Sequence, residues 1–306
     1  MNLMGCGTAL VTPFRGDGGV DEPALHGLVN WQIESGIDFL VPCGTTGEAS
    51  TLTQAEWLRV IELVVATAAG RVPVFAGCTH NATHEVVGRV QKLSQVTGLT
   101  GVLTANPYYN RPGQEGQYQH FRAIAEATDL PVLLYNIPSR TGANLEPATV
   151  LRLAELKNVI GIKESSGNIA QITELLTSAP RSFKVFAGDD GLALPVLALG
   201  GAGLISVASN VIPGQMSRMV RAALDNDWVD ARRINRQFFR LMQAHFWEAS
   251  PAPVKAVLQM LGRGEDVLRL PMVPVSEGTR RKLERMVGEL GMLVGVPASG
   301  DNLRMF

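Results

Sequence analysis

Eight short runs of apolar, strand-prone residues recur along this chain at nearly regular intervals. They begin near Cys6, Asp38, Val72, Gly101, Pro131, Val159, Lys184 and Gly203. Successive starts lie 32, 34, 29, 30, 28, 25 and 19 residues apart, and a βαβ unit occupies roughly 30 residues or more. Because the runs are almost continuously apolar, they fit parallel strands that are covered by helices. The recurrence therefore predicts repeated βα units around one parallel sheet.

Helical patterns fill the intervals between these runs. One interval carries apolar residues at helical spacing, at Leu25, Leu28, Val29 and Ile33. Thr53 and Glu56 have the spacing of a capping box ahead of another apolar helical face. Eight strands alternating with helices predict an α/β fold, a (β/α)₈ TIM barrel. A doubly wound open sheet is the alternative, but eight strands and the lack of GxGxxG after the first run favour the barrel.

The strand pattern stops near residue 215. Beyond it, helical patterns cover residues 220–246, 253–261 and 276–293. We therefore expect a barrel over residues 1–215 and a C-terminal helical extension over residues 216–306 that packs on the barrel.

Composition and charge exclude several classes of partner. The 306 residues are 46% hydrophobic with a net charge of -1, which argues against nucleic acid or an anionic membrane as a partner. No apolar run reaches the ~18 residues of a membrane span, and the first residues lack the basic start and apolar stretch of a signal peptide. The three cysteines, Cys6, Cys43 and Cys78, show no CxxC spacing and read as buried, reduced thiols. These features predict a cytoplasmic protein.

Lys163 is the candidate catalytic residue, because chemistry in such a barrel sits at the carboxyl ends of the strands. It ends the apolar run of residues 159–162. Burial disfavours an ammonium group and lowers its pKa, and a neutral amine can attack a carbonyl to form a Schiff base. The alternative is a strand-end lysine whose head reaches water. Period-two alternation places Gly161 beneath the lysine stem inside the barrel, with Ile160 and Ile162 facing the helices.

Hydroxyl groups are predicted near this lysine. Tyr135 ends the preceding strand, so its phenol could reach the amine and move the protons that Schiff-base formation requires. Thr45, Thr46, Tyr108 and Tyr109 also follow strands and could link the phenol to solvent.

Two features favour a carboxylate substrate. Residues 44–48 offer backbone N–H groups and two hydroxyls in a loop that leads toward a helix, which suits an anion. Arg140 lies just beyond the fifth strand, and a guanidinium binds carboxylates with two prongs. Asp189 and Asp190 have no partnering histidine nearby, so no metal site is expected.

Four motifs at the predicted strand ends carry a family resemblance: GTTGE at 44–48, YYNRP at 108–112, YNIPSRTG at 135–142 and GIKE at 161–164. Further matching segments lie at 187–190, 203–207 and 253–255. Together they resemble the dihydrodipicolinate synthase family. This belongs to the wider N-acetylneuraminate lyase family, whose members are pyruvate-dependent class I aldolases on a (β/α)₈ barrel.

The resemblance implies an enzyme that condenses pyruvate with aspartate 4-semialdehyde, in lysine and diaminopimelate biosynthesis, without metal or cofactor. Lys163 would form the imine with pyruvate. Tyr135, Thr45 and Tyr109 would form the proton relay, with Tyr109 reaching in from a neighbouring subunit of a homotetramer built as a dimer of dimers. Thr46 would hold the pyruvate carboxylate.

Substrate choice is implied by three further residues. Arg140 would receive the carboxylate of aspartate 4-semialdehyde, while Gly188 and Ile205 would line the pocket. One alternative is an aldolase that cleaves a 2-keto-3-deoxy sugar acid or N-acetylneuraminate. Another is a keto-acid sensor without turnover, although a mere binder would need no proton relay.

The resemblance also implies a groove for lysine as a feedback effector. Asn81, Glu85 and Tyr108 match positions of that groove. Gln54 and Trp57 stand where sensitive bacterial relatives carry histidines. Because an indole is bulkier than an imidazole and offers only a donor, inhibition by lysine is predicted to be weak or absent.

Overall fold

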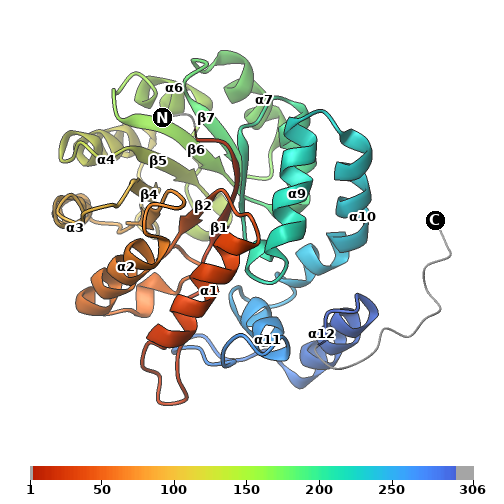
Figure 1. Cartoon of the computed structure of the whole chain (residues 1–306). Coiled ribbons are helices and arrows are strands. Elements are labelled where there is room, and N and C mark those ends of the chain that lie inside the picture. The colour runs from red at the N-terminus through yellow and green to blue at the C-terminus, as the bar shows by residue number, and fades with distance from the viewer. Residues whose placement is uncertain (1–2, 294–306) are drawn as a thin grey trace.

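The computed structural model describes residues 3–293 and forms a (β/α)₈ barrel, as predicted (Figure 1). Its eight strands are β1 (Gly5–Ala9), β2 (Phe39–Val41), β3 (Phe75–Gly77), β4 (Gly101–Ala105), β5 (Val132–Asn136), β6 (Val159–Glu164), β7 (Lys184–Ala187) and β8 (Gly203–Ser206). They pair in parallel in the order β2-β1-β8-β7-β6-β5-β4-β3. A parallel bridge between Leu40 and Val74 joins the two ends of this order and closes the barrel.

Helices surround the strands in chain order. They are α1 (Glu22–Glu34), α2 (Gln54–Ala68), α3 (Thr83–Leu93), α4 (Gln114–Glu126), α5 (Pro138–Thr141), α6 (Pro147–Leu153), α7 (Ile169–Ser178), α8 (Ala193–Ala198) and α9 (Pro213–Leu224). Short 3₁₀ turns are η1 (Ala49–Thr51), η2 (Asp190–Leu192) and η3 (Ala208–Asn210). The predicted capping box is confirmed: the Thr53 hydroxyl accepts from the Glu56 N–H and the Glu56 carboxylate accepts from the Thr53 N–H.

Two apolar layers lie on either side of the strands. The outer layer packs the helices onto the barrel, and the inner layer fills the barrel itself. Within the inner layer the Phe39 ring meets those of Phe75 and Phe186 edge to face, with centroids 6.2 and 5.5 Å apart. Gly7 makes room for Phe39, because a Cβ at Gly7 would collide with its ring. Because side chains fill the interior, the barrel is closed beneath the carboxyl ends of its strands.

The C-terminal helices differ from the prediction in one respect. The prediction of a single helix over residues 220–246 is wrong, since α9 ends at Leu224 and α10 (Trp228–Ala244) starts after a break. Asn226 in this break has a left-handed φ of 65°, and the Asp227 carboxylate caps α10 through the Asp230 N–H.

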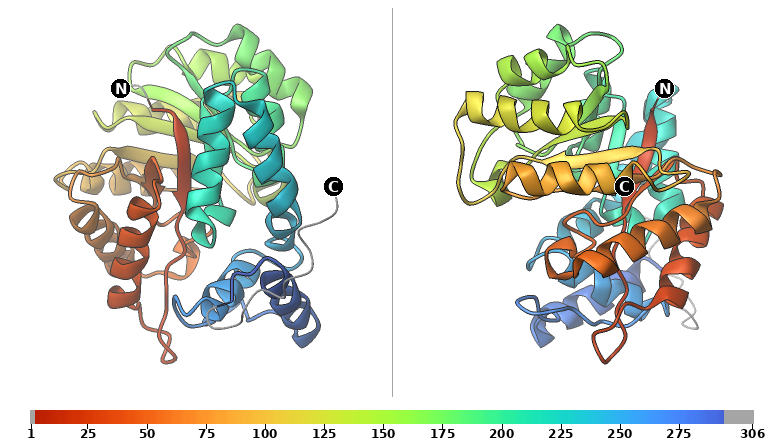
Figure 2. Two further views of the ribbon diagram at one scale, coloured as in Figure 1. Left: turned by 45° about the vertical axis from the view of Figure 1, so that its right-hand side comes forward. Right: turned by 90° about the vertical axis from the view of Figure 1, so that its left-hand side faces the viewer.

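The remaining helices, α11 (Ala252–Met260) and α12 (Glu277–Glu289), follow where helices were predicted. They lie to one side of the barrel, next to the loop that follows β1 (Figure 2). The division at residue 215 falls inside α9, which packs on β1. That division stays a prediction, and residues 294–306 of the expected extension lie outside the described residues.

The face assignment in β6 was wrong for Ile160. Ile162 packs in the outer layer as predicted, but Ile160 packs against the inner layer. The register with β5 shifts between Val132 and Leu133, so an extra residue interrupts the alternation, as in a β-bulge. A Cβ at Gly161 would collide with the backbone of Lys184 on β7. Gly161 therefore allows β6 and β7 to lie close together, and it does not leave room below the lysine stem.

Two further expectations concern cysteines and membranes. Cys6, Cys43 and Cys78 are buried free thiols, and burial raises the pKa of each. Among residues 3–293, none of the helices combines the length and apolar character needed to cross a bilayer.

Candidate active site

Lys163 and Tyr135 meet at the carboxyl ends of adjacent strands. They are register partners between β5 and β6, and the Lys163 Nζ lies 4.4 Å from the centroid of the Tyr135 ring. Only 5% of Lys163 and 7% of Tyr135 is exposed. The structure thus brings together the predicted nucleophile and the predicted phenol at the mouth of the barrel.

Gly188, at the end of β7, makes room for the lysine stem. A Cβ at Gly188 would lie 2.9 Å from the Lys163 Cγ and 3.0 Å from its Cε, and it would collide with the Ser165 hydroxyl. The space that the sequence assigned to Gly161 is therefore supplied by Gly188.

A network of buried amides lies behind this pair and was missed from the sequence. Asn136 follows Tyr135 and donates to the Glu164 carboxylate over 3.0 Å. Glu164 follows Lys163 and also accepts from the Gln171 amide and from the Ser166 N–H. The sequence did contain a sign of this network, since a polar residue directly follows both Tyr135 and Lys163 at the ends of buried strands. Because neighbouring strands are tied just past the site, the network fixes their relative positions.

The loop of residues 44–48, here called the threonine loop, lies at the end of β2. Two hydrogen bonds turn it back on itself, from the Gly47 N–H to the Gly44 carbonyl and from the Glu48 N–H to the Thr45 carbonyl. The Thr12 hydroxyl donates to the Gly47 carbonyl over 2.7 Å. Thr46 is buried and Thr45 is exposed. The loop therefore presents one threonine to solvent and holds the other inside.

A cavity of about 440 Å³ opens at these strand ends. Four predicted site residues contribute to its lining: Thr45, Tyr108, Tyr135 and Arg140. Trp57 and Arg89 also line it, and the Arg89 guanidinium lies 5.7 Å from the centroid of the Trp57 ring. Arg89 was not predicted; its helical position gives no sign from sequence that it faces a cavity.

Ile205 and Asp190 lie on the β7–β8 side of the site. Ile205 is fully buried in the inner layer. The buried Asp190 carboxylate accepts from the Ser206 hydroxyl over 2.5 Å and from the N–H groups of Val207 and Ala208. Burial raises the Asp190 pKa, although these three donors oppose the shift. Asp190 therefore ties the end of β7 to the turn after β8. Within residues 3–293, no cluster of His, Cys, Asp or Glu side chains is suited to hold a metal ion.

Tyr109 stands apart from Lys163. It has a left-handed φ of 73° and is 88% exposed, so the structure does not bring it to the lysine of its own chain. It lines a second, open depression of about 860 Å³ together with Arg111 and Arg140. The Arg140 side chain is exposed there and donates to the Ser250 carbonyl over 3.3 Å.

Only some residues of the implied effector groove line the 440 Å³ cavity. The Trp57 indole is buried and its N–H donates to the Gly77 carbonyl over 3.0 Å. Tyr108 and Trp57 line the 440 Å³ cavity, whereas Gln54, Asn81 and Glu85 lie outside its lining.

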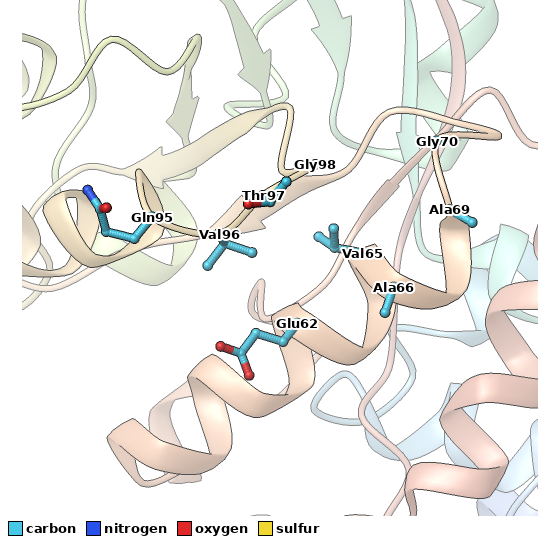
Figure 3. A pocket seen from close by; sticks show the side chains of 9 residues that line it. All are labelled: Glu62, Val65, Ala66, Ala69, Gly70, Gln95, Val96, Thr97 and Gly98. Carbon is cyan, nitrogen blue, oxygen red and sulfur yellow. The ribbon is translucent and has the colours of Figure 1, made fainter.

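A separate depression lies away from these residues, between the end of α2 and the loop before β4. Figure 3 shows its lining by Glu62, Val65, Gln95 and Gly98 among others. It contains none of the predicted site residues, so the site at the strand ends remains the candidate.

Comparison with known proteins agrees with this geometry. The model of the dihydrodipicolinate synthetase family matches residues 2–290. A protein of Acidobacterium capsulatum named 4-hydroxy-tetrahydrodipicolinate synthase is 62% identical over 97% of this chain and 99% of its own length. A protein of the same name from Koribacter versatilis is 57% identical over 96% of this chain and 98% of its own.

A solved structure agrees as well. The dihydrodipicolinate synthase of Aquifex aeolicus superposes with a TM-score of 0.93 at 41% identity, covering 96% of this chain and 100% of its own. The family match spans nearly the whole chain and includes every strand-end residue described above. This chain belongs to the dihydrodipicolinate synthetase family.

Proposed function

We propose that this chain is an enzyme that condenses pyruvate with aspartate 4-semialdehyde through an imine on Lys163, in lysine and diaminopimelate biosynthesis. Its family makes it a pyruvate-dependent lyase of class I. The observation that carries the proposal is the buried Lys163 amine beside the Tyr135 ring at the carboxyl ends of β5 and β6.

The chemistry begins with attack of the Lys163 amine on the keto carbon of pyruvate. Loss of water gives the imine, and loss of a proton from the methyl carbon gives an enamine. The enamine carbon attacks the aldehyde of the second substrate. The amino group of that substrate then closes the ring and displaces the lysine. Each step moves a proton, and the support for Tyr135 in this role is that its ring lies against the amine.

Both substrates carry a carboxylate, and the proposal gives each a partner. Thr46 with its loop backbone would hold the pyruvate carboxylate, since N–H groups in such a turn bind anions. Arg140 would hold the carboxylate of the semialdehyde, which its place at the rim of the cavity supports. Gly188 and Ile205 would line the pyruvate end. No metal or cofactor enters this scheme.

The assembly we propose is a cytoplasmic homotetramer made from two tight dimers. The support for a site shared between two copies is Tyr109, a residue that is 88% exposed and has a left-handed φ of 73°. A residue held in this way becomes useful if a second copy of the chain receives it. In the dimer, Tyr109 would complete the relay of Tyr135 and Thr45 in the partner.

A turnover assay tests the proposed reaction. Pyruvate is supplied with aspartate 4-semialdehyde and, in parallel, with several sugar aldehydes. We expect the highest kcat/KM with aspartate 4-semialdehyde. A higher value with a sugar aldehyde would assign a sugar-acid aldolase instead, and binding of pyruvate without any turnover would assign a sensor. Millimolar lysine should leave the rate nearly unchanged, because the bulky Trp57 indole already uses its only donor on Gly77.

A further inference from the structure

The threonine loop is bounded by two residues in an unfavourable backbone conformation. Cys43 and Glu48 have φ angles of 57° and 52°, in the left-handed region that residues other than glycine seldom occupy. Such conformations persist where the surrounding structure holds them in place. Thr45 and Thr46 lie between these two residues, so whatever holds the loop also sets the position of both threonines.

The Glu48 carboxylate is held by the C-terminal helical part of the chain. Its Oε1 lies 2.5 Å from the Lys255 Nζ, and its Oε2 accepts from the Arg269 N–H over 3.2 Å. Lys255 lies in α11 and Arg269 in the loop that follows it. Figure 2 shows these C-terminal segments beside the loops at the carboxyl end of β1.

Lys255 is itself fixed in place. Only 2% of the residue is exposed, and its Nζ donates to the Val267 carbonyl over 2.9 Å. The Nζ also lies 4.1 Å from the centroid of the Phe14 ring. Burial lowers the pKa of Lys255, while the neighbouring Glu48 carboxylate opposes that shift.

Arg269 closes the same cluster from the other side. Its guanidinium binds the Glu56 carboxylate with both prongs, at 2.9 and 2.6 Å, and donates to the Thr51 carbonyl. Glu56 also forms the capping box that begins α2. The loop and the start of the helix that follows it are thus fixed by one group of C-terminal residues.

A buried ion pair is a poor way to gain stability alone. Removing two charges from water costs about as much as their attraction returns, and apolar replacements of similar volume often do equally well. What a paired carboxylate and ammonium provide is a defined geometry. Here that geometry is imposed on the residue that ends the threonine loop.

We infer that Lys255, through Glu48, is a positioning residue that sets the place of Thr46 and the loop backbone for the pyruvate carboxylate. This inference rests on the proposed function, because it assigns the carboxylate to this loop. It makes the C-terminal helices part of the active site's support, although no residue of α11 or α12 lines the 440 Å³ cavity.

The test is the double variant Glu48→Gln/Lys255→Met. The glutamine keeps an oxygen for the Arg269 N–H, and the methionine replaces the lysine stem without a charge. We expect a folded protein whose kcat/KM for pyruvate falls about 10- to 100-fold, mainly through KM, while the KM for the aldehyde is unchanged. The matched control is Glu22→Gln/Arg59→Met, which removes an exposed ion pair between α1 and α2 and should leave both KM values unchanged.

Hydrogen exchange supplies a readout that needs no substrate. Amides of residues 44–48 should exchange faster in the double variant than in the unaltered protein, with no change in the control. Unchanged exchange and unchanged pyruvate kinetics in the folded double variant would overturn the inference. If that variant does not fold, Glu48→Gln alone is measured in the same way, with the same two outcomes.

A failure of the proposed function can be distinguished from a failure of the inference about Lys255. An unaltered protein that forms no imine with pyruvate contradicts the proposed function. In that case the exchange of residues 44–48 still decides whether Lys255 holds the loop.

Discussion

A single missing Cβ determines where the Lys163 side chain can lie. Gly188, the residue after β7, supplies the space for the lysine stem, and Tyr135 on β5 supplies the aromatic face against its amine. Lys163 could be recognised from the sequence because a lysine at the end of an apolar run is costly to bury. The glycine beside the lysine stem could not be identified from the alternation within β6, because a Cβ at Gly161 would meet the backbone of Lys184 and not the Lys163 side chain.

Gly188→Ala should therefore impair imine formation. The added methyl would lie within 3.0 Å of the lysine stem, and such overpacking costs about 1–3 kcal/mol, so the protein should fold with the amine displaced. We expect borohydride trapping of pyruvate to slow about 10- to 100-fold. Gly27→Ala is the control, since a Cβ there meets nothing within 4 Å. A normal trapping rate in Gly188→Ala would show that this glycine does not position the lysine.

Arg140→Ala should affect the second substrate and spare the first. A charge-assisted bond is worth about 1.5–3 kcal/mol, so kcat/KM for aspartate 4-semialdehyde should fall about 10- to 100-fold. Imine formation with pyruvate should be unchanged. Arg122→Ala, which removes an exposed pair with Glu126 on α4, serves as the control. Equal kinetics for the aldehyde in both variants would remove Arg140 from substrate binding.

At the scale of elements, the strands and helices followed from periodicity, but their faces and breaks did not. The eight apolar runs predicted all eight strands because buried parallel strands have no competing polar pattern. Apolar residues continue at helical spacing through residues 220–246, and this concealed the break between α9 and α10. The break depends on Asn226 in a left-handed conformation and on the Asp227 cap, which are local effects that a periodicity argument averages out.

His245, which ends α10, should make stability depend on pH. It is fully buried, and among residues 3–293 neither ring nitrogen has a hydrogen-bond partner. Burial lowers its pKa from the ordinary 6.5 of a histidine to about 3. Below about pH 6.5 the unfolded chain binds a proton that the folded chain does not. The contribution of the neutral His245 to the free energy of unfolding is therefore fully present above about pH 6.5. As the pH falls from there toward 3, the free energy of unfolding decreases by about 1.4 kcal/mol per pH unit.

Denaturant unfolding between pH 7 and 4 measures this dependence. His245→Phe should reduce the loss of unfolding free energy on acidification, because the phenylalanine cannot be protonated. His26→Gln, a change at an exposed position, should leave the loss as it is. If His245→Phe had the same pH profile as the unaltered protein, the neutral buried imidazole would not be the cause.

At the scale of the whole molecule, the residues that support the site come from distant parts of the chain. Arg269 and Glu48 are 221 residues apart in sequence, and Lys255 reaches the same carboxylate from α11. The sequence predicted the threonine loop from its own composition. It could not predict what holds the loop, since pairing of two charged residues depends on how the C-terminal helices pack on the barrel.

The assembly can be tested by mixing two inactive variants. Tyr109→Phe subunits lack the proposed donor to the partner, and Lys163→Ala subunits lack the nucleophile. In a mixed dimer, the site with an intact Lys163 would receive Tyr109 from the other subunit. Random mixing should then restore about a quarter of the unaltered activity. No recovery in proven mixed dimers, or full activity of a monomer in sedimentation, would contradict a shared site.

The most direct measurement of the central claim is the location of the pyruvate adduct. The protein is incubated with pyruvate, reduced with borohydride and mapped by peptide mass spectrometry. The chain has six lysines, of which Lys163 and Lys255 are buried. The account predicts one adduct per chain, on Lys163. An adduct on Lys255 or on any other lysine, or no adduct at all, would contradict it.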